Sequence, residues 1–338
     1  MRAYEIASGS TSLDGLRRSE RPEPQAGPGQ ILVRMKAASL NFRDLAIALG
    51  RYLGGPVKDK VVPLSDGAGE VIAIGAGVTR FRVGDRVAGT FFRNWIAGMP
   101  MPGPRAALGA PPADGVLSEL SVFNEQDAVA LPAQLSFEAG ATLPCAGVTA
   151  WHAVEVVGRI RPGQTVLVLG TGGVSIFALQ FARLAGARVL VTSSSDDKLQ
   201  RARALGAAVC INYRSTPEWD QEVLRLTDGR GVDLVVEVGG GGTLGRSFQS
   251  VGMGGKVALI GVLTGLATEA NPFALMMKYA SLHGIFVGSR LMFEQMNAAI
   301  ASATLEPVID RVFTFDEAPE AYRHLERGAH FGKVVIRI

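Results

Sequence analysis

The sequence predicts an α/β protein in which a doubly wound parallel sheet is joined to a mostly β domain that the chain builds in two parts. Strand and helix patterns alternate after Pro132, and a Gly-rich turn at Gly170 separates a buried strand from a helix. Strands joined by helices pair most economically as a parallel sheet. The last strand pattern, 332–337, returns to the texture of the amino-terminal third. We therefore expect a first domain from residues 1–129 and 287–338, and a second from residues 130–286.

Length and composition limit the classes of function. A chain of 338 residues is expected to form two domains, and 47% hydrophobic with 19% charged residues indicates large cores rather than disorder. The net charge of +3 comes from scattered basic residues, so we expect no nucleic-acid partner. With only Cys145 and Cys210, the chain can form neither a disulfide framework nor a four-cysteine zinc lobe. No secretory leader and no membrane-spanning run is evident, and we expect a cytoplasmic protein without a membrane partner.

The amino-terminal part reads as short β-rich stretches over 31–87, broken by Gly and Pro, with a helix near 41–50. A compact, mostly antiparallel unit is expected. Residues 94–115 are rich in Gly, Pro, Ala and Met without a usable period, which predicts an irregular loop. In the second domain we predict strands at 165–169, 188–191, 209–211, 234–238 and 257–260, with helices at 174–185 and 197–205.

The turn after the first of these strands has the pattern of a dinucleotide-binding loop. Gly170 permits the tight turn, Gly172 allows close approach to a pyrophosphate, and the helix starting near Gly173 directs N–H groups at the phosphates. Ser175 stands where the third glycine of the usual motif would be, so we expect slightly looser contact between helix and strand. The alternative is a structural turn in a domain that binds no nucleotide.

The end of the next strand predicts the cofactor. NAD-binding domains place Asp or Glu there to bind the ribose hydroxyls, whereas this chain has Ser193 followed by Ser194. These hydroxyls, with the ammonium of Lys198, could bind a 2′-phosphate, which favours NADP(H). Asp196 and Asp197 weaken the argument, and Lys198 could equally be an exposed helix residue.

Six segments together resemble the medium-chain dehydrogenase/reductase superfamily, and in particular its zinc-independent quinone oxidoreductase and polyketide enoyl reductase branch. The resemblance covers essentially the whole chain. It implies a Rossmann cofactor domain, a GroES-like substrate domain and a cofactor in the cleft between them. The segments are SLNFRDL (39–45), DGAGEV (66–71), FRVGDRV (81–87), ATLP (141–144), the loop at Gly170, and GKVV (332–335).

The same resemblance bears on metal binding. Zinc alcohol dehydrogenases carry Cys, His and Glu at the positions matched here by Asn41, Ser65 and Asp66, and a further ligand near Cys145. The lobe that holds a structural zinc is replaced by the Pro- and Gly-rich loop. No metal of either kind is therefore expected.

The resemblance also implies cofactor contacts. Tyr213 matches a position near the adenosine 2′-phosphate, and segments that follow strands should approach the nicotinamide ribose and ring. The expected cofactor-binding residues are Asn41, Thr149, Gly170, Thr171, Gly172, Gly173, Val174, Ser193, Ser194, Lys198, Tyr213, Gly239, Gly261, Val262, Phe286, Val287 and Lys333.

These observations predict an oxidoreductase that transfers hydride from NADPH to a quinone or an α,β-unsaturated carbonyl. Asn41 and Tyr52 are the candidate catalytic residues. Asn41 would orient the nicotinamide or the substrate by its amide, and Tyr52 could donate a hydrogen bond to the oxyanion or supply a proton, while Arg43 is more typical of a salt-bridged helix residue. The four histidines show no ligand spacing and are expected to be structural or exposed. The alternatives are a zinc-free alcohol or aldehyde dehydrogenase and a non-enzymatic NADPH-binding sensor. By analogy with relatives we expect a homodimer acting on a small molecule.

Overall fold

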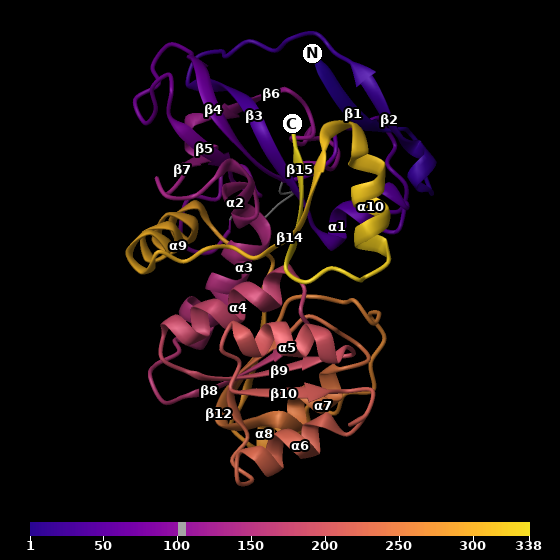
Figure 1. Cartoon of the computed structure of the whole chain (residues 1–338), viewed down its shortest axis with the longest axis vertical. Helices are drawn as coiled ribbons and strands as arrows, with labels where there is room; N and C mark the ends of the chain where they lie inside the picture. Colours follow the sequence, from indigo (N-terminus) through magenta and orange to yellow (C-terminus); the bar gives the residue numbers. More distant parts are fainter. Residues whose placement is uncertain (101–105) are drawn as a thin grey trace. The chain divides into compact units, whose positions relative to one another are not determined.

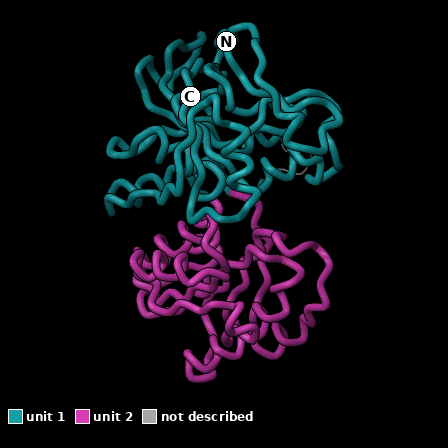
Figure 2. The backbone as a smooth tube through the Cα atoms, turned by 45° about the vertical axis from the view of Figure 1, so that its right-hand side comes forward, with its two compact units in different colours: residues 1–148, 288–338 teal, residues 149–287 magenta. Residues whose placement is uncertain are grey.

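The computed structural model describes residues 1–100 and 106–338, and the chain forms two compact units (Figure 2). The first unit consists of Met1–Val148 and Gly288–Ile338, and the second of Thr149–Val287. The first crossing between units thus follows Val148, further along the chain than the boundary expected after residue 129. In the described parts of the chain, no helix is both long enough and apolar enough to span a bilayer.

The first unit is built on a mostly antiparallel sheet (Figure 1). Its strand order is β14-β15-β3-β4-β5-β7, with β6 paired to β3, and only β14 and β15 run parallel among the described pairs. A separate hairpin joins β1 and β2. The strands are β1 (Arg2–Ile6), β2 (Leu16–Glu20), β3 (Gln30–Leu40), β4 (Asp66–Ile74), β5 (Arg86–Gly89), β6 (Leu120–Asn124), β7 (Ala128–Ala130), β14 (Ile309–Thr314) and β15 (Lys333–Arg337).

Alternation explains the central strand of this sheet. Ile31, Val33 and Met35 of β3 are buried and point to one face, as the period of two requires. The prediction that the carboxyl-terminal strand joins the amino-terminal domain is confirmed, because β15 pairs antiparallel with β3, Val334 lying opposite Leu40. The helices of this unit are α1 (Phe42–Ala48), α2 (Phe137–Ala141), α9 (Arg290–Ala303) and α10 (Ala318–Glu326), with a π-helical segment at Leu143–Gly147 and 3-10 turns at Leu13–Gly15, Glu125–Asp127 and Phe315–Glu317.

The second unit has the predicted parallel sheet, in the order β10-β9-β8-β11-β12-β13. The order reverses direction between β8 and β11, and ligands of doubly wound domains bind at the carboxyl ends of strands beside such a switch point. All five predicted strands are present. The bounds of β8 are as predicted, β9 and β10 end later, β11 and β12 begin earlier and end one residue earlier, and β13 was missed. The strands are β8 (Thr165–Leu169), β9 (Arg188–Ser193), β10 (Val209–Asn212), β11 (Val232–Glu237), β12 (Val251–Leu259) and β13 (Ser281–Gly284).

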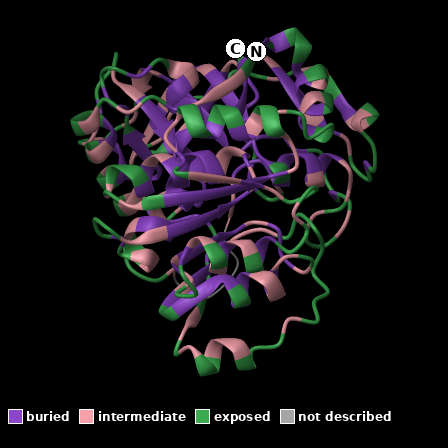
Figure 3. Ribbon diagram, turned by 60° about the horizontal axis from the view of Figure 1, so that its bottom comes forward, coloured by how far each residue is buried: buried purple, intermediate pink, exposed green. Residues whose placement is uncertain are grey.

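Helices connect these strands, and the strands of both sheets are largely buried (Figure 3). Both predicted helices are confirmed within one residue at each end, as α4 and α5. Three further helices were not predicted, because their patterns are short or interrupted. The helices of the second unit are α4 (Gly173–Leu184), α5 (Asp196–Ala204), α6 (Trp219–Leu226), α7 (Leu244–Ser250) and α8 (Phe273–Met277), and a π-helical segment at His152–Gly158 follows α3 (Val148–Trp151).

The loop between 94 and 115 is irregular in its described residues, as expected, and 101–105 lie outside the described residues. Within it, Arg93 donates its N–H to the carbonyl of Ala106, and Leu108 to that of Phe91. These bonds join the residues that lead into the loop to its second half.

Candidate functional site

The turn between β8 and α4 fits the phosphates of a dinucleotide. Gly170 has a φ of +73°, a left-handed conformation that glycine adopts without strain. Gly172 caps α4 without a side-chain hydrogen bond, so main-chain N–H groups at the start of this helix have no side-chain cap. An anion at this point gains both these donors and the positive end of the helix dipole. Of the other residues predicted to bind the cofactor here, Thr171 lies in the turn, and Val174 lies in the first turn of α4.

Ser175 corrects one expectation. It was expected to loosen the contact between helix and strand, yet its side chain is buried and its hydroxyl donates to the carbonyl of Leu169 at 2.7 Å. The third glycine of the usual motif permits close packing because it lacks a side chain, and here a hydrogen bond fastens α4 to β8 instead. The contact between α4 and β8 is therefore stabilised by this hydrogen bond and not loosened by the side chain.

The ends of β9 and β10 bring together the residues predicted for the adenosine end. Ser193 is buried, and its hydroxyl accepts the N–H of Ser195 at 3.4 Å. The N–H of Tyr213 donates to the carbonyl of Ser193 at 3.0 Å, which places the two residues on adjacent strand ends. Asn212 donates to Asp196 at 2.8 Å and so engages one of the two carboxylates that weakened the NADP(H) prediction. Ser194 lies next to this pair, and Lys198 lies in α5.

Arg214 was missed by the sequence reasoning. It directly follows Tyr213 and donates its main-chain N–H to the side chain of Asn212 at 3.0 Å. Its signal was its adjacency to Tyr213, because it adds a guanidinium to the residues expected at the adenosine end.

A second missed residue, Glu237, organises the loop after β11. Its side chain is fully buried, and it accepts the N–H groups of Gly239 at 2.7 Å and Gly240 at 3.0 Å. It also accepts the hydroxyls of Thr243, at 2.7 Å, and Ser247. An acidic residue that ends an apolar strand just before a glycine pair is the signal that could have revealed it, because a buried carboxylate needs such donors.

Most of the other predicted cofactor residues of the second unit follow strand ends, whereas Thr149 lies in the helix α3 (Val148–Trp151). Val262 and Phe286 are about half exposed, whereas Val287 and Thr149 are buried. Gly261 follows β12, and the N–H of Gly261 points to the carbonyl of Glu237 at 3.3 Å. The carboxyl edge of the sheet therefore gathers the ends of β8, β11 and β12, as a parallel sheet requires.

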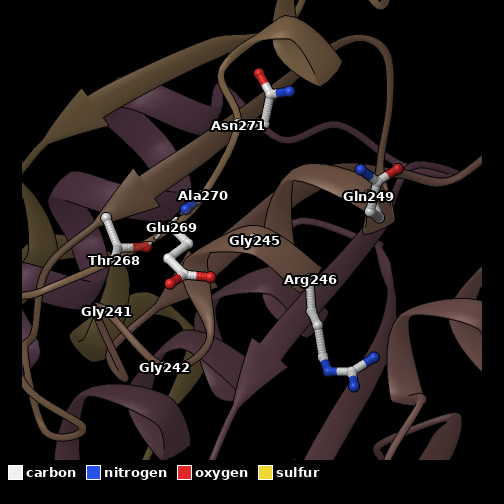
Figure 4. Close-up of a pocket in the computed structure, with 9 residues that line it drawn as sticks. All are labelled: Gly241, Gly242, Gly245, Arg246, Gln249, Thr268, Glu269, Ala270 and Asn271. Carbon is white, nitrogen blue, oxygen red and sulfur yellow. Dashed lines mark hydrogen bonds between the residues drawn. The ribbon is translucent and has the colours of Figure 1, made fainter.

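A polar pocket lies beside this loop, where α7 begins (Figure 4). Arg246 and Glu269 are the charged residues among those that line it, and Arg246 is already paired with Asp220. The pocket is therefore a poorer phosphate site than the turn after β8. Its lining residues are Gly241, Gly242, Gly245, Arg246, Gln249, Thr268, Glu269, Ala270 and Asn271.

In the first unit, Lys333 and Asn41 form the centre of a buried polar cluster. The ammonium of Lys333 is 3% exposed and donates to Oδ1 of Asn41 at 2.6 Å and to the carbonyl of Leu40 at 2.7 Å. Because Oδ1 is taken by Lys333, Nδ2 is the donor that Asn41 has left. This buried atom makes no hydrogen bond of normal geometry among the described residues, although the Asn41 side chain lies close enough to Asp66 to lower the pKa of that carboxyl. A buried donor without a partner is costly unless a ligand satisfies it.

Asp66 supplies the negative charge of this cluster. It is fully buried, lies 3.9 Å from the Lys333 ammonium, and accepts the Ser65 hydroxyl at 2.7 Å and the Cys145 N–H at 3.0 Å. Burial raises the pKa of Asp66, and Lys333 opposes that rise. Leu64, which precedes this pair, has a φ of +71°. Such strain in a non-glycine residue persists only where the surroundings enforce it.

Arg43 and Asp44 flank Asn41 on α1. Asp44 accepts the N–H of Asn41 at 2.8 Å and lies 3.3 Å from the Arg43 guanidinium. Arg43 also donates to the carbonyl of Leu108 at 2.8 Å, and its guanidinium lies over the ring of Tyr52 at 5.3 Å. Arg43 is thus ion-paired as expected. The structure brings Asn41 and Lys333 into direct contact, and it connects Tyr52 to them through α1.

These donors do not fit a zinc ion. Oδ1 of Asn41 is bonded to an ammonium, Asp66 is bonded to two donors, and burial raises the pKa of the Cys145 thiol, which disfavours the thiolate that zinc requires. Over the described ranges, 1–100 and 106–338, no group of three or more His, Cys, Asp and Glu side chains could hold a metal ion.

Comparison with known proteins agrees with this architecture. Residues 27–133 match the family described as alcohol dehydrogenase GroES-like domain, and residues 173–302 match the zinc-binding dehydrogenase family. The chain is 44% identical over 343 residues to the zinc-type alcohol dehydrogenase-like protein C1773.06c of Schizosaccharomyces pombe, with 99% of each chain covered. It belongs to the medium-chain dehydrogenase/reductase superfamily, whose members are nicotinamide-dependent oxidoreductases.

Within that superfamily, the chain resembles zinc-type alcohol dehydrogenase-like proteins. The structure of a putative alcohol dehydrogenase from Sinorhizobium meliloti has 43% sequence identity and a TM-score of 0.90, and each chain is covered completely. A quinone oxidoreductase from Pseudomonas syringae has 28% identity and a TM-score of 0.83, again over 100% of both chains. The quinone oxidoreductase likeness is thus among the more distant structural matches, and the zinc in the relatives' names is at odds with the donors of this chain.

Proposed function

We propose that this protein transfers hydride from NADPH to a quinone or an α,β-unsaturated carbonyl without a metal. The observation that carries the proposal is the 2.6 Å contact between Lys333 and Asn41. By the resemblance described above, Asn41 stands where zinc alcohol dehydrogenases carry a cysteine ligand. A conjugated acceptor needs hydride and hydrogen bonds to its developing oxyanion, which this cluster can offer. Oxidation of a simple alcohol would need a base or Lewis acid that the cluster does not supply.

The residues of the cluster have separate roles in this proposal. NADPH supplies the hydride when it is bound. Nδ2 of Asn41, a buried donor that makes no hydrogen bond of normal geometry among the described residues, donates to the developing enolate or quinolate oxygen. Lys333 holds Oδ1 of the same amide and increases the polarity of its N–H bonds. Tyr52 is the candidate proton donor, with Arg43 over its ring.

The preference for NADPH is supported by the ends of β9 and β10. Ser193 and Ser194 replace the acid that would repel a 2′-phosphate, and Tyr213 lies beside Ser193 through a main-chain bond. Lys198 and Arg214 are the nearby cations in sequence. NADPH is therefore favoured over NADH.

The test is NADPH oxidation by purified, EDTA-treated protein with a panel of quinones, enones, 2-alkenals and simple aldehydes, and with NADH in parallel. Turnover of conjugated acceptors that is unchanged by EDTA or added zinc supports the proposal. Reaction of simple aldehydes alone, or loss of activity with EDTA, contradicts it and favours an alcohol or aldehyde dehydrogenase. Tight NADPH binding without turnover favours a sensor.

We further propose a homodimer that forms through β13. This strand lies at the edge of the six-stranded sheet, and Met276, Met277, Tyr279 and Leu282 near it are exposed. An open edge beside apolar side chains pairs readily with a copy of itself. Light scattering should give twice the 35.6 kDa chain mass, and Leu282→Glu should lower it. A monomeric wild-type protein would contradict the proposal.

A further inference from the structure

Val287 has a backbone conformation that its side chain disfavours. Its φ is +60°, in the left-handed region, and it is a β-branched residue with 4% of its surface exposed. A β-branched residue in this region is a true outlier, because its Cβ substituents crowd the adjacent carbonyl. The conformation therefore needs a contact that enforces it, and such enforced strain concentrates at functional sites.

His152 contacts the main chain of this residue. Its Nδ1 lies 2.7 Å from the carbonyl oxygen of Val287. A carbonyl only accepts, so Nδ1 must carry the hydrogen. Burial lowers the pKa of His152, which keeps the ring neutral near pH 7 with a single N–H. This single N–H donates to the carbonyl of Val287.

Both partners of this bond are anchored to the same strand. His152 begins the π-helical segment His152–Gly158, and Lys256 of β12 donates to the carbonyl of Val157 in that segment at 2.7 Å. On the other side, the N–H of Ile285 donates to the carbonyl of Leu259 at the end of β12 at 2.8 Å. The bond thus joins two segments that β12 already fixes, and π-helical segments are frequent at functional sites.

The topology assigns this turn to one end of a dinucleotide. In the strand order β10-β9-β8-β11-β12-β13, the adenosine residues follow β9 and β10 and the phosphate turn follows β8. The part of the cofactor that remains must lie toward β11, β12 and β13. Val287 comes three residues after β13, which ends at Gly284, on the carboxyl edge of this half.

We infer that His152 is a positioning residue for the nicotinamide end of the cofactor, acting through Val287. By holding the Val287 carbonyl it fixes the main-chain groups of residues 286–287 for the nicotinamide carboxamide, a planar group that both donates and accepts hydrogen bonds. The inference rests on the proposed use of NADP(H). A preformed turn binds more tightly because it loses less conformational freedom on binding.

Calorimetric titration with NADP⁺ and with 2′-phospho-ADP-ribose, which lacks nicotinamide, tests the inference. His152→Leu should weaken NADP⁺ binding about tenfold, the effect of one buried hydrogen bond, and change 2′-phospho-ADP-ribose binding less than about twofold. Equal weakening of both ligands would mean that His152 is merely structural, and no change in either would also overturn the inference. If the wild-type protein prefers NADH, NAD⁺ and ADP-ribose replace the two ligands.

Two polar variants keep the test decisive if His152→Leu does not fold. His152→Asn places an amide donor where Nδ1 stands and should bind NADP⁺ like the wild type. His152→Gln places its donor near the position of Nε2 and should bind as weakly as His152→Leu. Equal affinities of the Asn and Gln variants would contradict the inference. Because the measurement needs no acceptor, wild-type protein that binds NADPH without turnover would disprove the proposed reaction and leave this inference standing.

Discussion

The ammonium nitrogen of Lys333 lies 2.6 Å from Oδ1 of Asn41, although 292 residues separate the two in sequence. The antiparallel pairing of β15 with β3 creates this contact, because Val334 lies opposite Leu40, which precedes Asn41. The last strand of the chain thus orients a side chain near its beginning. A single buried cation lies 3.9 Å from Asp66 and donates to the Asn41 amide, and in the proposed reaction it polarises that amide.

Replacing Lys333 with Met tests this arrangement. Asp66 would be left as a buried charge without its cation, and such losses destabilise proteins by about 3 to 5 kcal/mol. Asn41 would also lose its orienting partner, so kcat/KM with a conjugated acceptor should fall at least about tenfold. Urea unfolding and NADPH-oxidation kinetics measure the two effects.

Two further variants control this experiment. Adding Asp66→Asn to Lys333→Met removes the unpaired charge and should restore much of the stability, without restoring the rate. Lys60→Met removes an exposed lysine, with 67% side-chain exposure, and should cost less than about 1 kcal/mol. If Lys333→Met is as stable and as active as Lys60→Met, the cluster has no such role.

Ser193→Asp should move the cofactor preference toward NADH. A carboxylate at the end of β9 repels a 2′-phosphate and accepts hydrogen bonds from the ribose hydroxyls of NADH. We expect the ratio of kcat/KM for NADPH to that for NADH to fall by at least about tenfold. Ser302→Asp adds the same charge at an exposed position of α9 and should leave the ratio unchanged. An unaltered ratio in Ser193→Asp would mean that Ser193 does not lie beside the ribose of the cofactor.

Glu237→Gln should weaken the loop after β11. Glu237 accepts four hydrogen bonds, whereas a glutamine would point its NH2 group at some of the same donors. Unsatisfied buried groups of this kind cost about 1 to 3 kcal/mol each. Urea unfolding should show a loss in that range, with weaker NADPH binding. Glu269→Gln, an exposed residue of the same unit, is the matched control, and equal stability of the two variants would refute the role of Glu237.

The sequence could predict those features of the fold and the site that depend on residues close together in the chain. The buried strand, Gly170 turn and α4 follow each other within one stretch, so their spacing sufficed to predict the phosphate turn. The role of Lys333 depends on β15 pairing with β3, and the role of Glu237 depends on donors that converge only after the loop folds. His152 showed no ligand spacing because its partner is the main chain of Val287. This contact leaves no trace in residue types, because any residue supplies the carbonyl that His152 binds.

Asp44 should make the stability of the protein depend on pH. Burial raises its pKa to about 6, from an ordinary value of 3.8, despite the Arg43 guanidinium. Between these two values the folded protein binds more protons than the unfolded chain, so the contribution of this group to the free energy of unfolding falls as pH rises from about 4 to about 6. Asp44→Asn removes the titration and keeps a side-chain oxygen that can accept the N–H of Asn41. The melting temperature of the wild type minus that of Asp44→Asn should therefore be larger at pH 4.5 than at pH 7.5, as scanning calorimetry at both values would measure. A difference that stays constant with pH would mean that Arg43 and the Asn41 N–H hold the pKa of Asp44 at its ordinary value, and one that grows with pH would mean that they hold it lower.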